Sequence, residues 1–423
     1  MKPQTESRWY EGITRPQWMV LLIASLGWVF DVFEGQLYNT LKTPAVTAVM
    51  GPGASPDDVK SITGLTITCF LAGGALGGAV FGVLADRIGR RKVMIMTILL
   101  YSIFTALTAF ARTWQELAVL RFLVALGVAG EWAVGAALVS EVFPERARTA
   151  ASGLFHASSG IGVFLAAIVG MTIGATDWRA AFLLGLVPAL LTLGVRAGVQ
   201  EPERWTRVQG IESRGNLREL FTDPVLRRHT LAAAGLATVG LAGLWSTAFW
   251  APELAREVLK GSGMTDETEL RRLAGQAMLL MNIGNTAGLL CFAPLTARWG
   301  RRRTFLAYHV GVLLMAPIAF LGARDYAQAV VALGFLGFAA VGMHAGYAIY
   351  FPELFPTRLR ATGAGFCFNV GRIVAAPGPW LMTLLSQQVG GLRVAAVIAS
   401  SVYLLGIACL AFTPETADQP LPE

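Results

Sequence analysis

Long apolar runs dominate the chain and alternate with short polar turns. Twelve runs come close to the roughly 20 residues that a helix needs to cross the hydrocarbon of a bilayer. A transmembrane barrel is excluded, because its strands would be only about 10 residues long and would alternate polar with apolar positions. The pattern predicts an all-α membrane protein with 12 transmembrane helices. The predicted spans are 17–40, 64–85, 93–111, 117–140, 151–173, 179–198, 229–250, 274–296, 304–322, 327–350, 362–385 and 393–412.

Composition and charge support a membrane location. Of 423 residues, 54% are hydrophobic and only 14% are charged, too few charges to cover the surface of a soluble globule. If both termini are cytoplasmic, 21 Lys and Arg fall in inner segments and 10 in outer ones. This bias predicts that both termini are inside, and the net charge of +7 needs no nucleic acid to explain it. Short loops favour a bacterial inner membrane. We expect a monomeric multi-pass protein with membrane lipids as its surroundings.

The chain repeats three signals at nearly constant spacing. GVLADRIGRRKV at 82–93 returns as APLTARWGRRRTF at 293–305, with an offset of 211 residues. EVFPERARTAASG after the fourth span returns as ELFPTRLRATGAG after the tenth, and a Pro-Glu pair follows the sixth and the twelfth. An even number of spans per repeat keeps both copies in one orientation. The repeat predicts two pseudo-symmetric six-helix halves, 1–199 and 229–423, joined by a cytoplasmic linker at 200–228.

These repeated turns resemble those of the major facilitator superfamily, and the resemblance covers essentially the whole chain. It implies that family's fold, with a substrate site near the midplane and alternating access by rocking of the two halves. GVAGEWAVGAALVSEVFPERAR and GWVFDVFEGQLY look most like the proton-coupled organic-acid branches, such as the sialate, lactate and aromatic-acid symporters.

The resemblance also implies a conformational latch at the basic turns. Asp86 would accept hydrogen bonds from the N-terminus of a neighbouring helix and pair with a nearby arginine. Only the first copy has this carboxylate, because Ala297 occupies the matching position. A static cap whose arginines bind lipid phosphates is the alternative. The candidate latch residues are Gly82, Asp86, Arg87, Gly89, Arg90, Arg91, Glu141, Arg148, Arg298, Gly300, Arg301, Glu353 and Arg360.

Four charged residues inside spans one and four are candidates for proton coupling. A charge at bilayer depth is costly and is usually kept for function. Asp31 and Glu34 share a helix face, and Arg121 begins a run that resembles the span-four motif linked to proton coupling. We expect Asp31 or Glu34 to carry the proton with Arg121 as a switchable partner, or else a permanent ion pair. Glu131 is either an alternative carrier or a hydrogen-bond partner of a neighbouring helix.

Polar residues in the second half are candidates for substrate binding. Arg372 in span eleven can hold a carboxylate with its planar fork, or it can neutralise an acidic residue. Asn369 lies one turn before it. Asn282 with Asn285, and His344 with Tyr347, each share a helix face, and either pair lines the cavity or joins helices.

The combined pattern predicts a carrier rather than an enzyme or a channel. The sequence has no HExxH or GxSxG motif, no repeated pore ring, and no metal-ligand spacing among its four cysteines. We expect a secondary active transporter for a small organic anion, with no cofactor and a proton gradient as the energy source. A proton-coupled sugar or polyol symporter, a proton-driven exporter and a transporter-derived receptor remain as alternatives.

Overall fold

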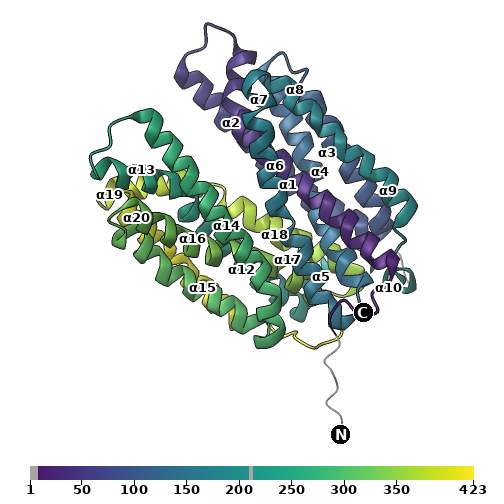
Figure 1. Ribbon diagram of the computed structural model, residues 1–423. Coiled ribbons are helices and arrows are strands. Elements are labelled where there is room, and N and C mark those ends of the chain that lie inside the picture. Colours follow the sequence, from purple (N-terminus) through teal and green to yellow (C-terminus); the bar gives the residue numbers. More distant parts are fainter. Residues whose placement is uncertain (1–7, 209–212) are drawn as a thin grey trace. The chain divides into compact units, whose positions relative to one another are not determined.

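The computed structural model describes residues 8–208 and 213–423, apart from the side chains at 192, 193, 196, 197 and 271. These residues are helical along most of their length and contain no strand (Figure 1). Ten helices in the described part of the chain are long and apolar enough to cross a membrane. The all-α prediction is therefore confirmed.

Two predicted spans are not among these ten long helices and are built from shorter helical pieces. The span expected at 179–198 is built from α8 (Trp178–Leu183), a 3-10 segment (Leu184–Leu190) and α9 (Leu191–Gly198). The span expected at 362–385 is built from α18 (Arg360–Ala375) and α19 (Gly378–Gln388). A proline, which removes a backbone hydrogen bond, lies at each interruption: Pro188 in the first and Pro377 in the second.

The contacts divide the chain into two compact units. Unit 1 comprises Met1–Asn216, Phe355–Gly365 and Asp418–Glu423, and unit 2 comprises Leu217–Leu354 and Phe366–Ala417. The predicted halves and linker stay a prediction, and residues 1–7 and 209–212 lie outside the described residues.

Each unit is described by its own helices, and α18 begins in unit 1 and continues in unit 2. The other helices of unit 1 are α1 (Arg15–Met50), α2 (Pro56–Ile88), α3 (Arg90–Thr108), α4 (Trp114–Val142), α5 (Glu145–Ala157), α6 (Ser159–Met171), α7 (Ile173–Thr176), α8, α9 and α10 (Glu203–Arg207). Those of unit 2 are α11 (Glu219–Thr222), α12 (Pro224–Ser246), α13 (Ala251–Gly261), α14 (Glu267–Trp299), α15 (Arg301–Pro317), α16 (Tyr326–Gly342), α17 (His344–Leu354), α19, α20 (Leu392–Ser400) and α21 (Val402–Leu410).

Local sequence signals account for the helix boundaries. Ser55 caps α2 by accepting from the Asp58 N–H at 3.1 Å, and Pro56 follows at the first helical position. The helix ends where Gly89 takes a φ of 111°, a conformation that favours glycine. Helix α14 ends in the same way at Gly300, with a φ of 82°.

Glycines permit a close helix crossing in each unit. A Cβ at Gly73 or Gly77 of α2 would lie 2.1 or 2.2 Å from a backbone oxygen of α4. In unit 2, a Cβ at Gly284 or Gly288 of α14 would likewise lie 2.0 or 2.1 Å from a backbone oxygen of α16. Each unit-2 glycine lies 211 residues after its counterpart. The internal repeat is therefore visible as a repeated helix crossing.

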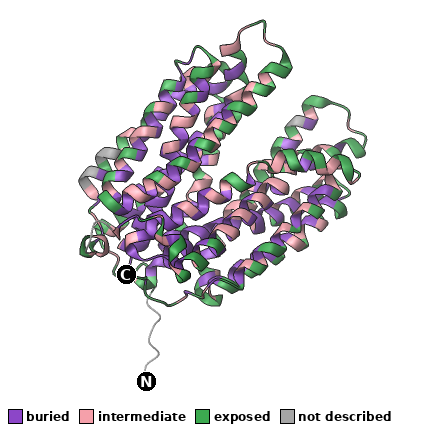
Figure 2. Cartoon of the chain, turned by 180° about the vertical axis from the view of Figure 1, so that it is seen from behind, coloured by how far each residue is buried: buried purple, intermediate pink, exposed green. Residues whose placement is uncertain are grey.

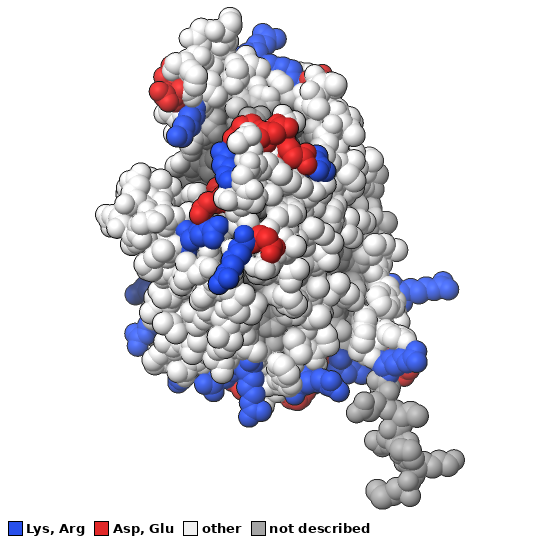
Figure 3. All heavy atoms as spheres, turned by 60° about the vertical axis from the view of Figure 1, so that its left-hand side comes forward, with Lys and Arg blue, Asp and Glu red and all other residues white. Residues whose placement is uncertain are grey.

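The outward faces of the helices are apolar. Phe110, Met171, Leu190, Phe335 and Leu405 are each more than 60% exposed. Figure 2 shows exposed residues along the helices of both units, and the face in Figure 3 carries its charges in patches with broad uncharged areas between them. Exposed apolar surface on this scale is typical of contact with lipid.

Replacing Gly77 with alanine should lower thermal stability, because the new methyl group would meet the Leu126 carbonyl oxygen at 2.2 Å. Overpacking of this kind costs about 1–3 kcal/mol. Gly64→Ala on the same helix is the matched control, since nothing lies within 4 Å of its Cβ position. The control should be neutral or slightly stabilising. Thermal unfolding in detergent measures both, and equal midpoints would contradict the close crossing.

Candidate functional site

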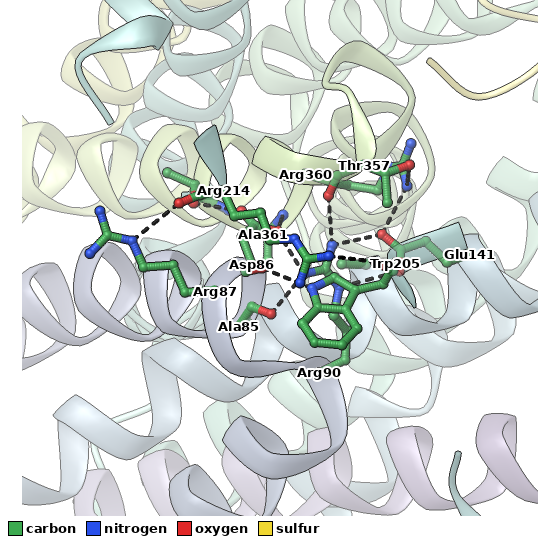
Figure 4. A network of polar contacts seen from close by, with 12 residues as sticks. Ala85, Asp86, Arg87, Arg90, Glu141, Trp205, Arg214, Thr357, Arg360 and Ala361 are labelled. Carbon is green, nitrogen blue, oxygen red and sulfur yellow. Dashed lines mark hydrogen bonds and ion pairs between the residues drawn. The ribbon is translucent and has the colours of Figure 1, made fainter. Parts of the chain in front are cut away.

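A buried ion-pair network occupies one end of unit 1 (Figure 4). Arg90 Nη1 lies 2.8 Å from Asp86 Oδ1, and Arg90 Nε and Nη2 donate to Glu141 at 3.2 and 2.8 Å. Glu141 also accepts from Arg360 Nη1 at 2.8 Å. All four side chains have 0% exposure. Two carboxylates and two guanidinium groups make the network formally neutral, which limits the cost of burying these charges.

Asp86 also binds the start of α18. Its carboxylate accepts from the Ala361 N–H at 3.3 Å and from the N–H and hydroxyl of Thr362 at 2.8 and 2.6 Å. A negative charge is favourable at a helix N-terminus. Gly82 permits this approach, because a Cβ there would lie 2.8 Å from the Ala361 carbonyl oxygen. The predicted arrangement around Asp86 is present, and its action as a latch stays a prediction.

Sequence reasoning did not identify the carboxylate that caps α3. Glu201 accepts from the backbone N–H groups of Arg90 and Arg91 at 2.8 and 3.1 Å. Burial raises the pKa of Glu201, and these N–H donors act in the opposite direction. Gly89 has a φ of 111°, a conformation that favours glycine, and its lack of a Cβ leaves room for the Glu201 carboxylate. The acidic EPERW segment after span six was the only signal that could have indicated this cap.

Unit 2 contains a second copy of the same geometry. Arg301 donates to Glu353 at 3.0 and 2.7 Å, and Glu415 accepts from the N–H groups of Arg301 and Arg302 at 2.8 and 3.1 Å. A Cβ at Gly300 would lie 2.7 Å from Glu415. All three repeated sequence signals therefore converge on one site per unit.

The two copies differ in three respects. Glu201 precedes its proline whereas Glu415 follows its own, so the third repeated signal does not align residue for residue. Glu353 accepts a hydrogen bond from the Thr416 hydroxyl at 2.6 Å, whereas Glu141 accepts one from Arg360. Ala297 supplies no carboxylate.

The other candidate latch residues differ in burial. Arg87 and Arg298 are exposed, and Arg87 Nε donates to the Arg214 carbonyl at 3.1 Å. Arg148 is buried in α5.

The chain segment at 418–423 packs on the same end of unit 1. Arg360 Nη2 donates to the Pro422 carbonyl at 2.8 Å, and Leu421 is buried. A cavity of about 1040 Å³ lies next to this segment, lined in part by Arg15, Glu201 and Thr357. None of the residues predicted to couple protons or bind substrate lines it.

The charged residues of spans one and four, Asp31, Glu34, Arg121 and Glu131, all lie buried in unit 1. Arg121 forms an ion pair with Glu34 and donates to the Thr108 hydroxyl at 2.9 Å. The structure thus pairs Arg121 with Glu34, and the coupling roles stay predictions.

Arg372 belongs to an aromatic and imidazole cluster in unit 2. Its guanidinium carbon lies 5.0 Å from the centroid of the Phe368 ring, and its charge acts on His344. The rings of His344 and Tyr347 lie 5.2 Å apart, and the Tyr347 hydroxyl donates to the Leu236 carbonyl at 3.0 Å. Four of these residues come from α17 and α18.

The remaining amide candidates have different surroundings. Asn369 is buried on α18, one turn before Arg372. On α14, Asn285 Nδ2 donates to Asn282 Oδ1 at 2.8 Å, and a Cβ at Gly337 of α16 would lie 2.1 Å from Asn285 Oδ1. The Asn282–Asn285 hydrogen bond lies within one helix, and both roles expected for this pair stay predictions.

Comparison with known proteins gives consistent matches. Residues 43–268 match the model of the Major Facilitator Superfamily, and residues 210–423 match the model named Sugar (and other) transporter. A "Probable 4-methylmuconolactone transporter" of Cupriavidus pinatubonensis is 31% identical, covering 96% of this chain and 93% of that protein. The sialic acid transporter NanX of Escherichia coli is 26% identical, covering 90% of each chain.

Solved structures support the same fold. The proton:xylose symporter XylE bound to 6-bromo-6-deoxy-D-glucose matches with a TM-score of 0.77 at 17% identity, covering 96% of this chain and 97% of that one. The predicted 12-helix fold is confirmed.

Replacing Glu141 with glutamine should destabilise unit 1 strongly, because Arg90 and Arg360 would lose a shared carboxylate in a buried site. Breaking a buried pair costs about 3–5 kcal/mol. Glu203→Gln is the control, since the Glu203–Arg207 pair is 83% and 78% exposed and should contribute only about 0–1 kcal/mol. Denaturant unfolding compares the two variants. A similar small effect for both would contradict the buried network.

Asp86→Asn should speed amide hydrogen exchange at Ala361 and Thr362. These N–H groups lie in the first turn of α18, have no intrahelical acceptor and donate to the Asp86 carboxylate. Mass spectrometry of the peptide covering 357–365 measures the change. Asp57→Asn, at an exposed position on the same helix as Asp86, is the control and should leave this peptide unchanged. Unaltered exchange in Asp86→Asn would show that the carboxylate does not hold the segment.

Proposed function

Because the chain belongs to the major facilitator superfamily, we propose that it couples proton entry to the uptake of a small organic anion by alternating access. It is a multi-pass membrane transporter and not an enzyme, as the family and its named relatives indicate. Both termini are proposed to face the cytoplasm, and the proton gradient is proposed to supply the energy without a cofactor.

The cluster around Arg372 is the main support for an anionic substrate. A guanidinium group presents donors in a fixed fork that matches a carboxylate. The adjacent His344 donates from Nδ1 toward the Val341 carbonyl at 3.1 Å, and its buried Nε2 has no hydrogen-bond partner among the described residues. Tyr347 and Phe368 supply apolar ring faces beside these polar groups. Such a mixture suits a small organic acid that carries both a carboxylate and a carbon skeleton.

The relatives support the same substrate class. Both curated relatives described above have names that refer to organic acids, 4-methylmuconolactone and sialic acid. The likeness to the xylose symporter is below 20% identity and bears on the fold alone.

Buried charge supports proton coupling. Asp31, Glu34 and Glu131 are at most 2% exposed, at positions within predicted spans. Three carboxyl groups accompany one guanidinium group, that of Arg121, on α1 and α4. Acidic groups placed this deep can exchange protons between the two sides as access alternates.

Arg372→Ala should raise the half-saturating substrate concentration about 10- to 100-fold, the loss expected for a charge-assisted hydrogen bond. The measurement is uptake of radiolabelled lactate, sialate, benzoate and glucose into proteoliposomes, with and without an inward proton gradient. Arg256→Ala is the matched control, because Arg256 pairs with Glu267 at the surface of unit 2 and should leave uptake unchanged.

We expect a carboxylate to accumulate only when the proton gradient is present. We expect this accumulation to be weaker in Arg372→Ala. Accumulation of glucose alone would favour a sugar symporter. Gradient-driven outward flux would favour an exporter and contradict the proposed direction.

A further inference from the structure

His344 lies at an interruption in one membrane helix of unit 2. Helix α16 ends at Gly342 and α17 begins at His344, within the single candidate span Tyr326–Leu354. Arg372 also lies close to a helix end, three residues before α18 stops at Ala375. Interrupted helices within spans are typical of the places where secondary transporters bind their substrates. Both residues therefore occupy positions that suit substrate binding.

A chain of rings connects His344 to Arg372. The ring centroids of His344 and Tyr347 lie 5.2 Å apart, and those of Tyr347 and Phe368 lie 6.1 Å apart. The Arg372 guanidinium carbon lies 5.0 Å from the Phe368 ring centroid. His344 and Arg372 thus belong to one cluster, in which the rings between them offer apolar faces.

The hydrogen bond of His344 determines which of its ring nitrogens carries the proton. Nδ1 lies 3.1 Å from the Val341 carbonyl oxygen, and a carbonyl oxygen is only an acceptor, so Nδ1 carries the hydrogen atom. In the neutral ring Nε2 is then an acceptor. A second proton on Nε2 would bury another cation in the cluster that contains Arg372, which is costly unless an anion compensates it.

The Nε2 acceptor of His344 has no hydrogen-bond partner among the described residues, and the residue is only 7% exposed. The hydroxyl of the neighbouring Tyr347 ring is engaged elsewhere, because it donates to the Leu236 carbonyl oxygen at 3.0 Å. A buried polar atom that lacks a partner is costly and requires an explanation, such as a ligand or a water molecule that completes its bonding. A donor on the substrate meets this requirement.

A carboxylate cannot donate to Nε2, because it has only acceptors, but it matches the guanidinium group of Arg372. We propose that the substrate is a hydroxy acid whose carboxylate binds Arg372 while its hydroxyl group donates to Nε2 of His344. The proposal rests on the organic-anion function proposed above and narrows its substrate class. Arg372 then provides the affinity that all organic anions share, and His344 selects among them.

The hydroxyl group needs a conformation in which the cluster is open. Nε2 of His344 is shielded from solvent in this structure. Alternating access, as proposed above, would provide an open conformation in which the substrate reaches Nε2, and binding would then favour that conformation.

Matched pairs of acids test the role of the hydroxyl group. The purified protein in detergent is titrated with lactate or propionate, and with each hydroxybenzoate isomer or benzoate, and the shift of the thermal midpoint measures binding without transport. We expect lactate, or at least one hydroxybenzoate, to bind about 10-fold more tightly than the acid without the hydroxyl group. Equal affinities within every pair would overturn the proposal and leave the organic-anion function standing. Absence of binding by every acid, sialate included, would instead refute that function.

Variants assign the preference to particular side chains. His344→Phe removes the acceptor and keeps a ring, so it should weaken binding of the hydroxy acid alone and abolish the preference. Arg372→Ala should weaken binding of both acids of a pair and keep the preference. His229→Phe on α12 is the matched control, because Nδ1 of His229 also lies beside a backbone carbonyl, that of Leu354, and it should change neither affinity.

Two results with His344→Phe would overturn the proposal. One is a preference for the hydroxy acid that survives in this variant. The other is binding of the acid without the hydroxyl group that strengthens at acid pH in the wild type and is lost in the variant, since a protonated His344 would then bind the carboxylate itself. If the variant does not fold, the comparison of acid pairs on the wild type still decides.

Discussion

Every charge that this chain buries must be neutralised, because an uncompensated charge is costly in hydrocarbon and in a packed interior. The constraint explains the composition of the network around Arg90, where two carboxylates meet two guanidinium groups with no exposure. It also explains the Arg301–Glu353 pair of unit 2. The buried charges of spans one and four differ, since three carboxyl groups accompany one guanidinium group. A proton is the simplest group that can balance such a site, and a proton can leave again.

The internal repeat places the same physical solution in each unit. A glycine with positive φ ends one helix, a glutamate from a distant segment caps the next, and an arginine bridges to a second glutamate. The functional asymmetry comes from single substitutions within this shared frame. Asp86 binds the start of α18, whereas Ala297 offers no acceptor. A duplicated motif thus acquires a specific partner in only one copy.

The sequence was sufficient for the fold class, because each apolar run is long enough to identify a membrane span without knowledge of its neighbours. The repeat could be found for a similar reason, since Arg90 and Arg301 lie in matching strings. Side-chain pairing could not be predicted. Helix α4 is apolar on nearly all sides and most of its residues are buried, so periodicity does not indicate which face meets α1. The pairing of Glu34 with Arg121 depends on that rotation. The cap at Glu201 was missed because it joins segments more than 100 residues apart.

The most direct test of proton-coupled anion symport is the balance point of the wild-type protein in proteoliposomes. The pH difference is held constant while the anion gradient is varied until net flux stops. Symport of one proton with each monovalent anion predicts that net flux stops when the inside-to-outside concentration ratio of the anion equals the outside-to-inside concentration ratio of protons, whatever the membrane potential. A balance point that does not move with the pH difference would contradict coupling to protons.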